Sequence, residues 1–452
     1  MKVQQLLTTE IAVIGGGPSG LIAAKAASRE GKKVMLIERN GYLGGCATMS
    51  LVVPLMSFHA GDKQIINGYA QQLIDKISEL GGTIGHTIDP LGVGASITPV
   101  DTEIYKYAAQ EFLLEEDVQI LYHTELIGAE IEKDNILSIV VKTRSGLYKI
   151  KANRYIDATG DGDLAYLSGV PMTVGRDKDG KCQPMSMMFK VGNVDINKVV
   201  KYADANPEEF VVHSKLGSLG EAKRIAVSGF FKQVSEAQKE RVLTLNRDRV
   251  LFFELNRRGE IAVNMSRIID KISVRDFDLS DATIEGRRQV FEIMSFFKKF
   301  IPGFEDAILM ESGNQIGVRE SRRIVGDHTI NEFDVVEGKL FDDTIALGSW
   351  PIDIHDPEGK SLEIKEMKWG TYYGIPYRCL VPKKINNLIV TGRTISATHE
   401  AFASTRVSPI CMALGQAAGI AAVLSLEKNT VFRELPYDEL KDILIKTGQV
   451  LN

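Results

Sequence analysis

Three glycines near the start of the chain have the types and spacing that hold a phosphate group. Gly15, Gly17 and Gly20 form a G-x-G-x-x-G pattern directly after an apolar run, Ile11–Ile14. Gly15 permits a tight turn, Gly17 lets the backbone approach a pyrophosphate, and Gly20 lets the following helix pack on the sheet. That helix would offer unpaired N–H donors and a partial positive charge to the phosphates. The pattern therefore indicates a dinucleotide site.

The elements that must position these glycines can be predicted from the same stretch. The apolar run before the glycines and a second run, Val34–Ile37, predict two strands, and small residues from Leu21 to about Arg29 predict the helix between them. Glu38 closes the second strand, 18 residues after the last glycine, where an acid accepts a hydrogen bond from a ribose hydroxyl. The complete unit favours a dinucleotide site over a chance glycine turn. The residues expected to contact the cofactor here are Gly15, Gly17, Pro18, Ser19, Gly20, Glu38 and Arg39.

A pair of glycines closely follows Glu38. Gly44 and Gly45 resemble the flavoprotein loop whose backbone lies against the pyrophosphate and isoalloxazine of FAD, whereas a nicotinamide dehydrogenase more often continues into another helix here. Disulfide reductases carry two redox cysteines in this loop, but Cys46 stands alone and Leu51 occupies the partner's position. We interpret Cys46 as a small packing residue beside the cofactor, with a nucleophile as the alternative.

Two later segments return to the same cofactor. A short strand ending in Asp157 runs into Ala-Thr-Gly, a recurring mark of the two-part FAD-binding domain, where small residues let the backbone pass close to the cofactor. An ordinary Asp/Gly turn is the alternative. Another buried strand, Asn387–Val390, also ends in a glycine-containing turn. From these two segments we expect contacts to FAD by Ala158, Thr159, Gly160, Asp161, Gly392 and Arg393.

A long helix of small residues is predicted after these segments. Ser408 is expected to cap it and Pro409 to occupy its first turn, while its alanines and glycines permit close approach to the sheet. Its amino-terminus would stabilise the negative charge that develops near flavin N1 on reduction. A purely structural packing helix is the alternative. Although the run Val407–Leu426 is strongly apolar, Pro409, Gln416 and several glycines interrupt it, so we predict a buried helix rather than a membrane span.

Candidate substrate-binding residues lie mostly in a region without a dinucleotide signature, residues 174–369. Three of its arginines fall within five residues, between short apolar and glycine-containing pieces, and could clamp an anionic substrate or hold negative charge on the reduced flavin. A solvated charged face is the alternative. His355 is an acid/base candidate because only histidine titrates near neutrality unaided, and a structural histidine bonded to neighbouring carboxylates is its alternative. The catalytic candidates are His355, His399, Arg319, Arg322, Arg323 and Arg406.

Length and composition narrow the class of protein. At 452 residues, with 44% apolar and 25% charged residues, an ordinary globular protein of two to three domains is expected. The net charge of −5 gives no basic surface for nucleic acid. Four cysteines without a C-x-x-C pair signal neither a zinc site nor a dithiol centre, and without a signal peptide they suggest a cytoplasmic setting. We expect no nucleic acid, membrane or metal partner, while a homo-oligomer stays open.

With these motifs in place, the chain resembles the stand-alone bacterial FAD-dependent oxidoreductases, which are related more distantly to the glutathione-reductase-like and fumarate-reductase-like flavoproteins. The resemblance covers most of the chain and includes the loop Pro351–Pro357. Its more particular marks are the run Arg319–Arg323 and the tripeptide Thr398-His399-Glu400. It implies an α/β fold with tightly held FAD: a two-part Rossmann-like FAD-binding domain, residues 1–173 and 370–452, with an inserted mixed α+β substrate (cap) domain, residues 174–369.

The expected reaction is hydride transfer from a small organic substrate to flavin N5, between the FAD and cap domains. Because only one G-x-G-x-x-G is present, no separate NAD(P)H domain is expected, and an unknown electron acceptor must reoxidise the flavin. Two alternatives remain, a flavin-dependent reductase of an unsaturated acid and a non-catalytic FAD-binding redox sensor. The substrate, the direction and a covalent flavin link, for example through His59 or His86, stay open.

Overall fold

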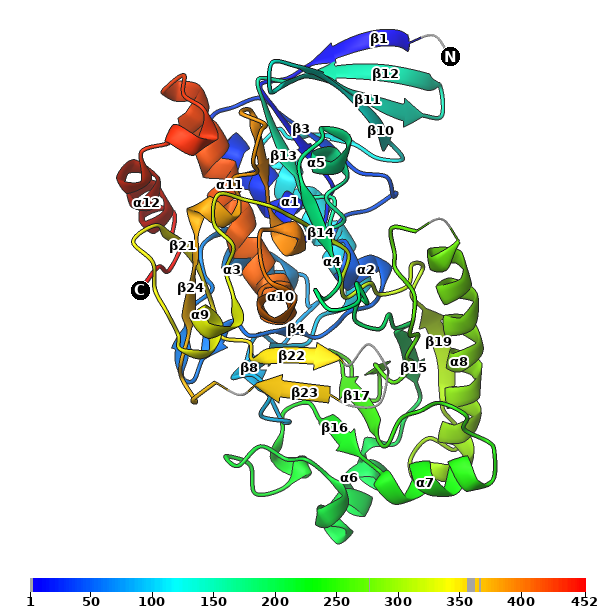
Figure 1. Cartoon of the computed structure of the whole chain (residues 1–452). Helices are drawn as coiled ribbons and strands as arrows, with labels where there is room; N and C mark the ends of the chain where they lie inside the picture. The colour runs from blue at the N-terminus through cyan, green and yellow to red at the C-terminus, as the bar shows by residue number, and fades with distance from the viewer. Residues whose placement is uncertain (1–2, 276, 356–361, 366) are drawn as a thin grey trace.

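A parallel sheet forms the centre of the upper half of the molecule (Figure 1). The structure is a computed structural model that describes residues 3–275, 277–355, 362–365 and 367–452. All neighbouring strands of this sheet pair in parallel, in the order β25 (Leu388–Val390), β13 (Arg154–Asp157), β2 (Ile11–Ile14), β3 (Val34–Ile37) and β9 (Gln119–Leu121). The strands predicted on either side of the glycine turn are confirmed. The sheet joins segments that lie far apart in the sequence.

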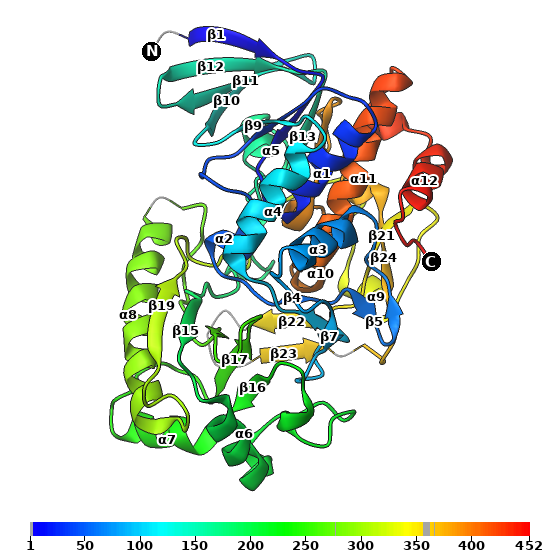
Figure 2. The same ribbon diagram turned by 180° about the vertical axis from the view of Figure 1, so that it is seen from behind.

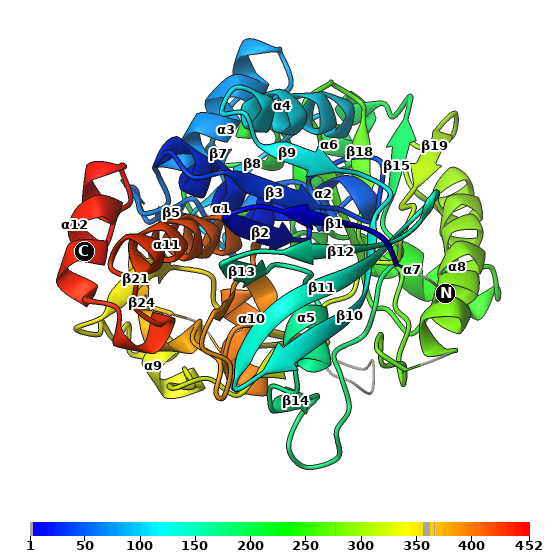
Figure 3. The same cartoon turned by 90° about the horizontal axis from the view of Figure 1, so that it is seen from above.

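Alternate side chains of the central strands face two different layers, as the period of a strand requires. Ile11 and Val13 of β2 belong to the core that contains the helices, whereas Ala12 and Ile14 belong to the core on the opposite face. Figure 3 shows α1, α3, α4 and α11 gathered on one side of β2 and β3. These helices span Pro18–Arg29, Tyr69–Glu79, Thr102–Leu114 and Ser408–Glu427. The helical spacing of residues 67–80 and the amphipathic pattern of residues 99–116 predict two helices, and α3 and α4 confirm them, with Asp101 capping α4.

The opposite face of the central sheet is covered by a second, four-stranded sheet and the short helix α5 (Asp163–Leu167). Its strands, in the order β1, β12, β11 and β10, span Val3–Thr8, Gly146–Lys151, Asn135–Thr143 and Glu125–Glu132. The sequence predicts strands at residues 136–143 and 148–152 joined by a tight turn at residues 144–146, and the pairing of β11 with β12 confirms this prediction. β1 and β10 were not predicted, because their side chains are largely exposed and carry little apolar periodicity.

A separate core fills the lower half of the molecule and is formed by residues between Met185 and Ile316. Its five-stranded sheet has the order β16, β17, β18, β15 and β19, with ranges Ala226–Gly229, Val250–Glu254, Ile261–Val263, Phe189–Gly192 and Ile308–Ser312. Helices α6, α7 and α8 accompany it and span Ile196–Ala205, Phe231–Lys239 and Asp278–Phe300. The sequence predicts a strand pair at residues 250–255 and 260–264 and a long helix at residues 280–300, and β17, β18 and α8 confirm them. We call this unit the cap.

The sequence predicts helix starts in the cap at residues 206–209, where Pro207 follows Asn206 as a cap, and at residues 235–241, and both predicted starts are wrong. Asn206 follows the end of α6 and donates its side-chain amide to Tyr202 O, and only a single 3-10 turn, Pro207–Glu209, comes after it. The next residue, Phe210, pairs with Gly229 as an antiparallel bridge, so the chain has turned into extended structure. Ser235 lies inside α7, which begins at Phe231. Tertiary pairing overrides the local Asn-Pro start signal here.

Strand β22 (Ile352–His355) lies between the cap and the larger core, by which we mean the core that contains the helices packed on the central sheet. Figures 1 and 2 both show it, with its antiparallel partner β23 (Leu362–Lys365), between α10 (His399–Thr405) and the cap strands β16 and β17. Ile352 and Ile354 pack into the larger core, which leaves alternate residues of β22 for the other side. The sequence predicts only a connector at residues 400–406, before α11. In the structure this segment belongs to the helix α10, which is capped by Thr398. The predicted loop Pro351–Pro357 ends in residues 356 and 357, which lie outside the described part of the chain.

Helix α11 crosses α1 at very close range. A Cβ added to Gly415 would lie 2.1 Å from Ser19 O, and one added to Gly419 would lie 2.4 Å from Ala23 O. The small residues therefore permit close approach, as predicted, but these two glycines meet α1 rather than the sheet. By length and hydropathy α11 could cross a membrane, yet 94% of its most apolar window is buried inside the protein, so the prediction of a buried helix is confirmed. Val407, not Ser408, is its N-cap residue.

Candidate active site

Three separate turns meet at the amino-terminus of α1. Gly45 faces Gly17, since a Cβ added to Gly45 would lie 2.7 Å from Gly17 Cα, and Gly44 N donates to Gly16 O at 2.9 Å. From the distant segment after β25, a Cβ added to Gly392 would lie 3.2 Å from Ser19 Cβ. Ser19 Oγ and Thr391 Oγ1 share a hydrogen bond of 2.8 Å. The structure thus brings the predicted cofactor segments around residues 15–20, 44–46 and 392 together.

The residues at this meeting point fit a dinucleotide. No described side chain caps the first turn of α1, so its N–H donors stay available for phosphate. Gly17 is open on one side, because a Cβ there would meet nothing nearer than Gly45 Cα at 3.9 Å. Glu38 Oε2 accepts a hydrogen bond from Gly16 N at 2.7 Å and no second one from the described residues, so it keeps a lone pair for a ribose hydroxyl.

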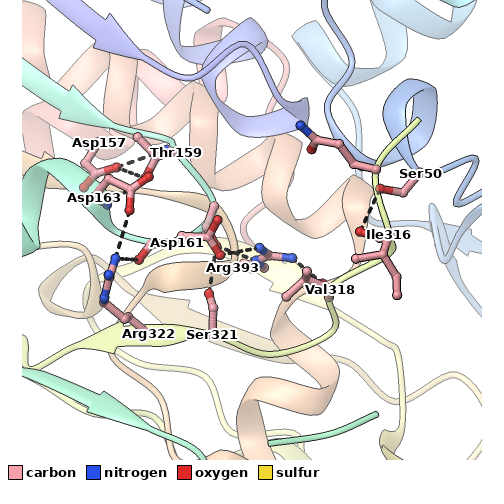
Figure 4. A network of polar contacts seen from close by, with 12 residues as sticks. Ser50, Asp157, Thr159, Asp161, Asp163, Ile316, Val318, Ser321, Arg322 and Arg393 are labelled. Atoms are coloured by element: carbon pink, nitrogen blue, oxygen red, sulfur yellow. Dashed lines mark hydrogen bonds and ion pairs between the residues drawn. The ribbon is translucent and has the colours of Figure 1, made fainter. Parts of the chain in front are cut away.

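The turn after β13 is fixed by a buried carboxylate. Asp157 Oδ1 accepts hydrogen bonds from Thr159 N and Oγ1 at 3.0 and 2.8 Å, and Oδ2 accepts one from Ala165 N at 2.8 Å. Burial raises the pKa of Asp157 to about 6. Figure 4 shows this carboxylate beside Thr159 and Asp163. These hydrogen bonds therefore fix the conformation of the turn at residues 159–161, at the edge of the sheet where a cofactor would pass.

Arg393 ties that turn to the cap segment that carries Arg319. Its guanidinium donates to Gly160 O, to Val318 O and, at 2.8 Å, to Asp161 Oδ1 (Figure 4). In the same view Ser50 Oγ, just beyond the glycine pair, donates to Ile316 O at 3.4 Å. The chain from residue 316 to 319 thus lies directly against two of the three cofactor segments.

The remaining cofactor candidates lie close by. Cys46 Sγ lies 3.6 Å from Ser408 Oγ, so the glycine loop meets the start of α11. No described side chain caps α11, which leaves its first N–H donors available for a partly negative flavin ring. Pro409 lies in the first turn of this helix. Arg39 donates to Gln315 Oε1 at 3.3 Å, at the outer rim of the same region.

Two of the three clustered arginines are engaged in structural contacts. Arg322 donates to Asp163 Oδ1 at 2.8 Å and to Asp161 O, and its guanidinium lies over the Tyr166 ring. Arg323 is buried and donates to Glu320, to Ala397 O and to Gly175 O. Arg322 therefore braces the turn after β13, whereas Arg323 joins Glu320 to the backbone at Ala397 and Gly175.

His399 belongs to the same buried network. Its Nδ1 lies 2.8 Å from Glu320 Oε1, which also accepts from Arg323. Glu320 Oε2 accepts from Gln183 N at 2.9 Å. Burial alone would raise the pKa of Glu320, but the hydrogen bond and charge of His399 and the charge of Arg323 lower it overall. Glu320 thus links Arg323, His399 and the backbone of Gln183.

A second group of polar residues gathers where the cap meets β22 and α10. From the cap it includes Arg319, which donates to Pro184 O and Ser186 Oγ, both at 2.7 Å, and to Asn264 Oδ1 at 3.2 Å. From the other side, Arg406 Nη2 donates to Asp353 O at 3.3 Å. We call this group the basic cluster; its members are Arg247, Arg267, Arg319, Asp353, His355 and Arg406.

Charge links the members of the basic cluster. Burial, together with Arg406, Arg267 and Arg247, lowers the pKa of Arg319 to about 9, while Asp353 acts in the opposite direction. Burial and Arg267 lower the pKa of Arg247 to about 10. Although burial opposes it, the contact with His355 and the charges of Arg406 and Arg319 hold the pKa of Asp353 well below its usual value. At neutral pH the arginines are positive and Asp353 is negative.

His355 is held on both ring nitrogens. Nδ1 lies 3.2 Å from Arg267 Nη2, and Nε2 lies 3.3 Å from Asp353 Oδ2. Because a guanidinium only donates, Nδ1 must accept, and Nε2–H then donates to Asp353. Burial and the charge of Arg319 lower the pKa of His355 to about 3, so the ring is neutral near pH 7. In this arrangement the ring has no free lone pair for a substrate proton, and it orients Asp353.

Replacing His355 with glutamine is expected to make the protein more tolerant of mild acid. Below about pH 6.5 the unfolded chain protonates this histidine, whereas the folded protein does so only near pH 3. The stability contributed by the neutral ring is therefore complete above pH 6.5 and is lost as the pH falls toward 3. From pH 7 to 5 the wild-type protein should lose about 2 kcal/mol that the variant keeps. Urea unfolding at both pH values measures this, and equal acid sensitivity would contradict it.

Three members of the basic cluster were missed from the sequence. Arg247 and Arg267 lie just before β17 and just after β18, and neither position has a local pattern that separates it from a surface arginine. Asp353 could have been found, because it lies two residues before His355 on a strand, where alternate residues share a face.

A protein-family match covers nearly the whole chain. Residues 10–444 match the family described as FAD dependent oxidoreductase. Among curated proteins, thiamine thiazole synthase from Desulfosudis oleivorans is 54% identical over 39 residues, which is 9% of this chain and 15% of that protein. The match thus spans a small part of the curated relative.

Solved structures align with this chain over nearly its full length. A flavin-dependent brominase aligns with a TM-score of 0.50 and 10% identity, covering 97% of this chain and 84% of its own. A geranylgeranyl bacteriochlorophyll reductase-like protein from Thermoplasma acidophilum aligns with a TM-score of 0.47 and 13% identity, covering 98% and 85%. L-proline dehydrogenase from P. horikoshii gives 0.44 and 13%, covering 98% and 99%. At these identities the likeness concerns the fold alone.

Proposed function

Because this chain belongs to the FAD-dependent oxidoreductase family, we propose that it oxidises a small organic substrate held at the basic cluster, between the cap and the larger core. When bound, FAD supplies the redox chemistry and takes up a hydride at N5. Gly17, Glu38, Gly45 and the free amino-terminus of α11 would hold the cofactor. The protein's task is then to bind, orient and deprotonate the substrate beside it.

The observation that carries this proposal is the place of the basic cluster. Arg319 follows directly on the segment that Arg393 and Ser50 tie to the cofactor turns. Arg406 lies two residues before the start of α11, whose Ser408 touches Cys46. Polar side chains from the cap and from the larger core therefore converge beside the cofactor segments. A protein that used FAD only for structure would not need such a group there.

Asp353 is the residue we assign to proton acceptance. Its Oδ1 is buried and has no hydrogen-bond partner among the described residues, while Oδ2 is held by His355. A substrate hydroxyl or amine could donate to Oδ1, so that its proton leaves to Asp353 as the neighbouring C–H bond breaks. The low pKa of Asp353 keeps its carboxylate ionised near pH 7, so Oδ1 is available to accept the hydrogen bond of the substrate.

The test is anaerobic mixing of the FAD-loaded protein with hydroxy acids, sugars, amines and enoates. We expect at least one hydroxy or amino compound to bleach the oxidised flavin band. In the Arg406→Gln variant, FAD should stay bound while the bleaching rate constant per molar substrate falls roughly 10- to 100-fold, because a charge-assisted hydrogen bond contributes about 1.5–3 kcal/mol. Arg433→Gln, at a surface ion pair with Asp327, is the matched control and should bleach normally.

Two outcomes would redirect this proposal. The distant resemblance to fumarate-reductase-like flavoproteins allows the opposite direction, and reoxidation of chemically reduced protein by an enoate, without bleaching by any donor, would support a reductase. If neither half-reaction occurs with any compound, the catalytic proposal fails and FAD acts as a sensor or a structural group.

A further inference from the structure

We propose that the substrate is a small organic dianion whose two acidic groups are bound by arginines from opposite sides of the basic cluster. This inference rests on the proposed function, because it names the class of molecule that the cluster holds. It follows from the charge balance of the described residues and from buried donors that have no partner.

The cluster carries an excess of positive charge. Besides Arg267, the cluster contains three guanidiniums, those of Arg247, Arg319 and Arg406. Among the described members they are balanced only by the single carboxylate of Asp353. Other nearby acids are already engaged: Asp248 pairs with Arg249, and Glu320 is bound by Arg323 and His399. The excess is two unit charges, and a buried excess of this size needs compensation from a ligand.

Two donors of the cluster and one beside it are buried and have no hydrogen-bond partner among the described residues. Arg406 Nη1, Arg247 Nε and Gln183 Nε2 have no hydrogen-bond acceptor in the part of the chain that the structure describes. Gln183 is 1% exposed, and its Oε1 accepts from His355 N at 3.3 Å, so its free amide lies against the cluster. Buried polar groups are normally hydrogen-bonded, and three unused donors around one carboxylate point to acceptor atoms from a ligand.

The position of the donors favours two acidic groups rather than one. Arg406 ends α10 in the larger core, whereas Arg247 lies between α7 and β17 in the cap. Arg319 is fixed between them by Ser186 and Asn264, and it adds its charge without moving. A molecule with an acidic group at each end would bridge the two sides and place its middle carbons beside Asp353.

Titration calorimetry on the FAD-loaded protein tests this without turnover. The probes are malonate, succinate and fumarate as dicarboxylates, acetate as a monoanion, succinamide as a neutral match, and glycerol phosphate as a phosphate monoester, all at constant ionic strength. We expect at least one dianion to bind at least about 30-fold more tightly than acetate, with no heat from succinamide. Glycerol phosphate carries both of its charges on one phosphate, so tighter binding of this probe than of every dicarboxylate would contradict two separate acidic groups.

Two variants two residues apart provide the control. Arg247→Gln should weaken dianion binding roughly 10- to 100-fold. Arg249→Gln should leave it unchanged, because Arg249 is already paired with Asp248 at 2.7 Å. Equal weakening by both variants, equal affinity for succinamide or acetate, or no binding of any dianion would overturn the inference. Bleaching of the flavin by a neutral compound with no dianion binding would leave the proposed function standing while this inference falls.

Discussion

Replacing Gly17 with valine is expected to give a protein that folds normally but purifies without FAD. The backbone at Gly17 has φ −70° and ψ −177°, which any residue adopts, and a Cβ there would meet no described atom nearer than 3.9 Å. The chain itself therefore does not need glycine at this position. A valine side chain would occupy the space where a pyrophosphate must approach the helix, so FAD affinity should fall at least about 100-fold.

Absorbance at the flavin band and circular dichroism of the same sample measure cofactor and fold separately. The matched control is Gly128→Val, in β10, where an added Cβ would lie 3.6 Å from Val140 Cβ, an ordinary contact far from the cofactor segments. It should purify with a full complement of FAD. By contrast, Gly20→Ala should disturb the fold itself, because its Cβ would lie 1.9 Å from Gly15 O. A yellow Gly17→Val protein would refute the cofactor site described above.

Glu320→Gln is expected to lower the free energy of unfolding by about 3–5 kcal/mol. The substitution keeps the shape but removes the charge that balances Arg323, whose guanidinium is almost completely buried. Arg323 would keep its bonds to Ala397 O and Gly175 O, but carbonyl oxygens cannot replace a counterion in a site with little solvent. His399 would also lose its carboxylate partner.

Chemical unfolding of the FAD-loaded variants measures this effect. The double variant Glu320→Leu with Arg323→Met removes both charges together and should recover most of the lost stability, since the desolvation penalty disappears with them. Asp327→Asn, which removes an exposed partner of Arg433, should change stability by about 1 kcal/mol or less. If Glu320→Gln lies as close to the wild type as Asp327→Asn does, the network is not a source of stability.

The cofactor half of the molecule was predicted well because its signals are local. The strand at Ile11–Ile14, the glycine turn and the helix after it are specified within twenty residues, and each choice has a backbone reason. The return of β25 to the sheet could be predicted only because this segment, too, is an apolar strand that ends in a glycine-containing turn, Thr-Gly. The exact cap residue of α11 was shifted by one position, since Ser408 turns to Cys46 instead of capping the helix.

The substrate half was predicted less well because arginines only a few residues apart in the sequence have different partners in the structure. Arg319, Arg322 and Arg323 look alike in the sequence, yet the first lies in the basic cluster and the other two brace Asp163 and Glu320. No periodicity separates them, because the chain passes from an irregular segment into β20 (Arg322–Ile324) between the first and the second. The partners of Arg319 come from the cap, and only the tertiary fold brings Arg247 and Arg267 beside it.

The long-range pairing of β25 with β13 has a consequence for biosynthesis. While a ribosome is still translating the cap, β13 is an open edge and the apolar face of α1 lacks α11, which later covers it. The nascent chain must keep these surfaces from aggregating until residues beyond 388 emerge, a period in which chaperones can bind them. Cofactor capture is therefore expected to be a late event in the production of this protein, after synthesis has passed α11.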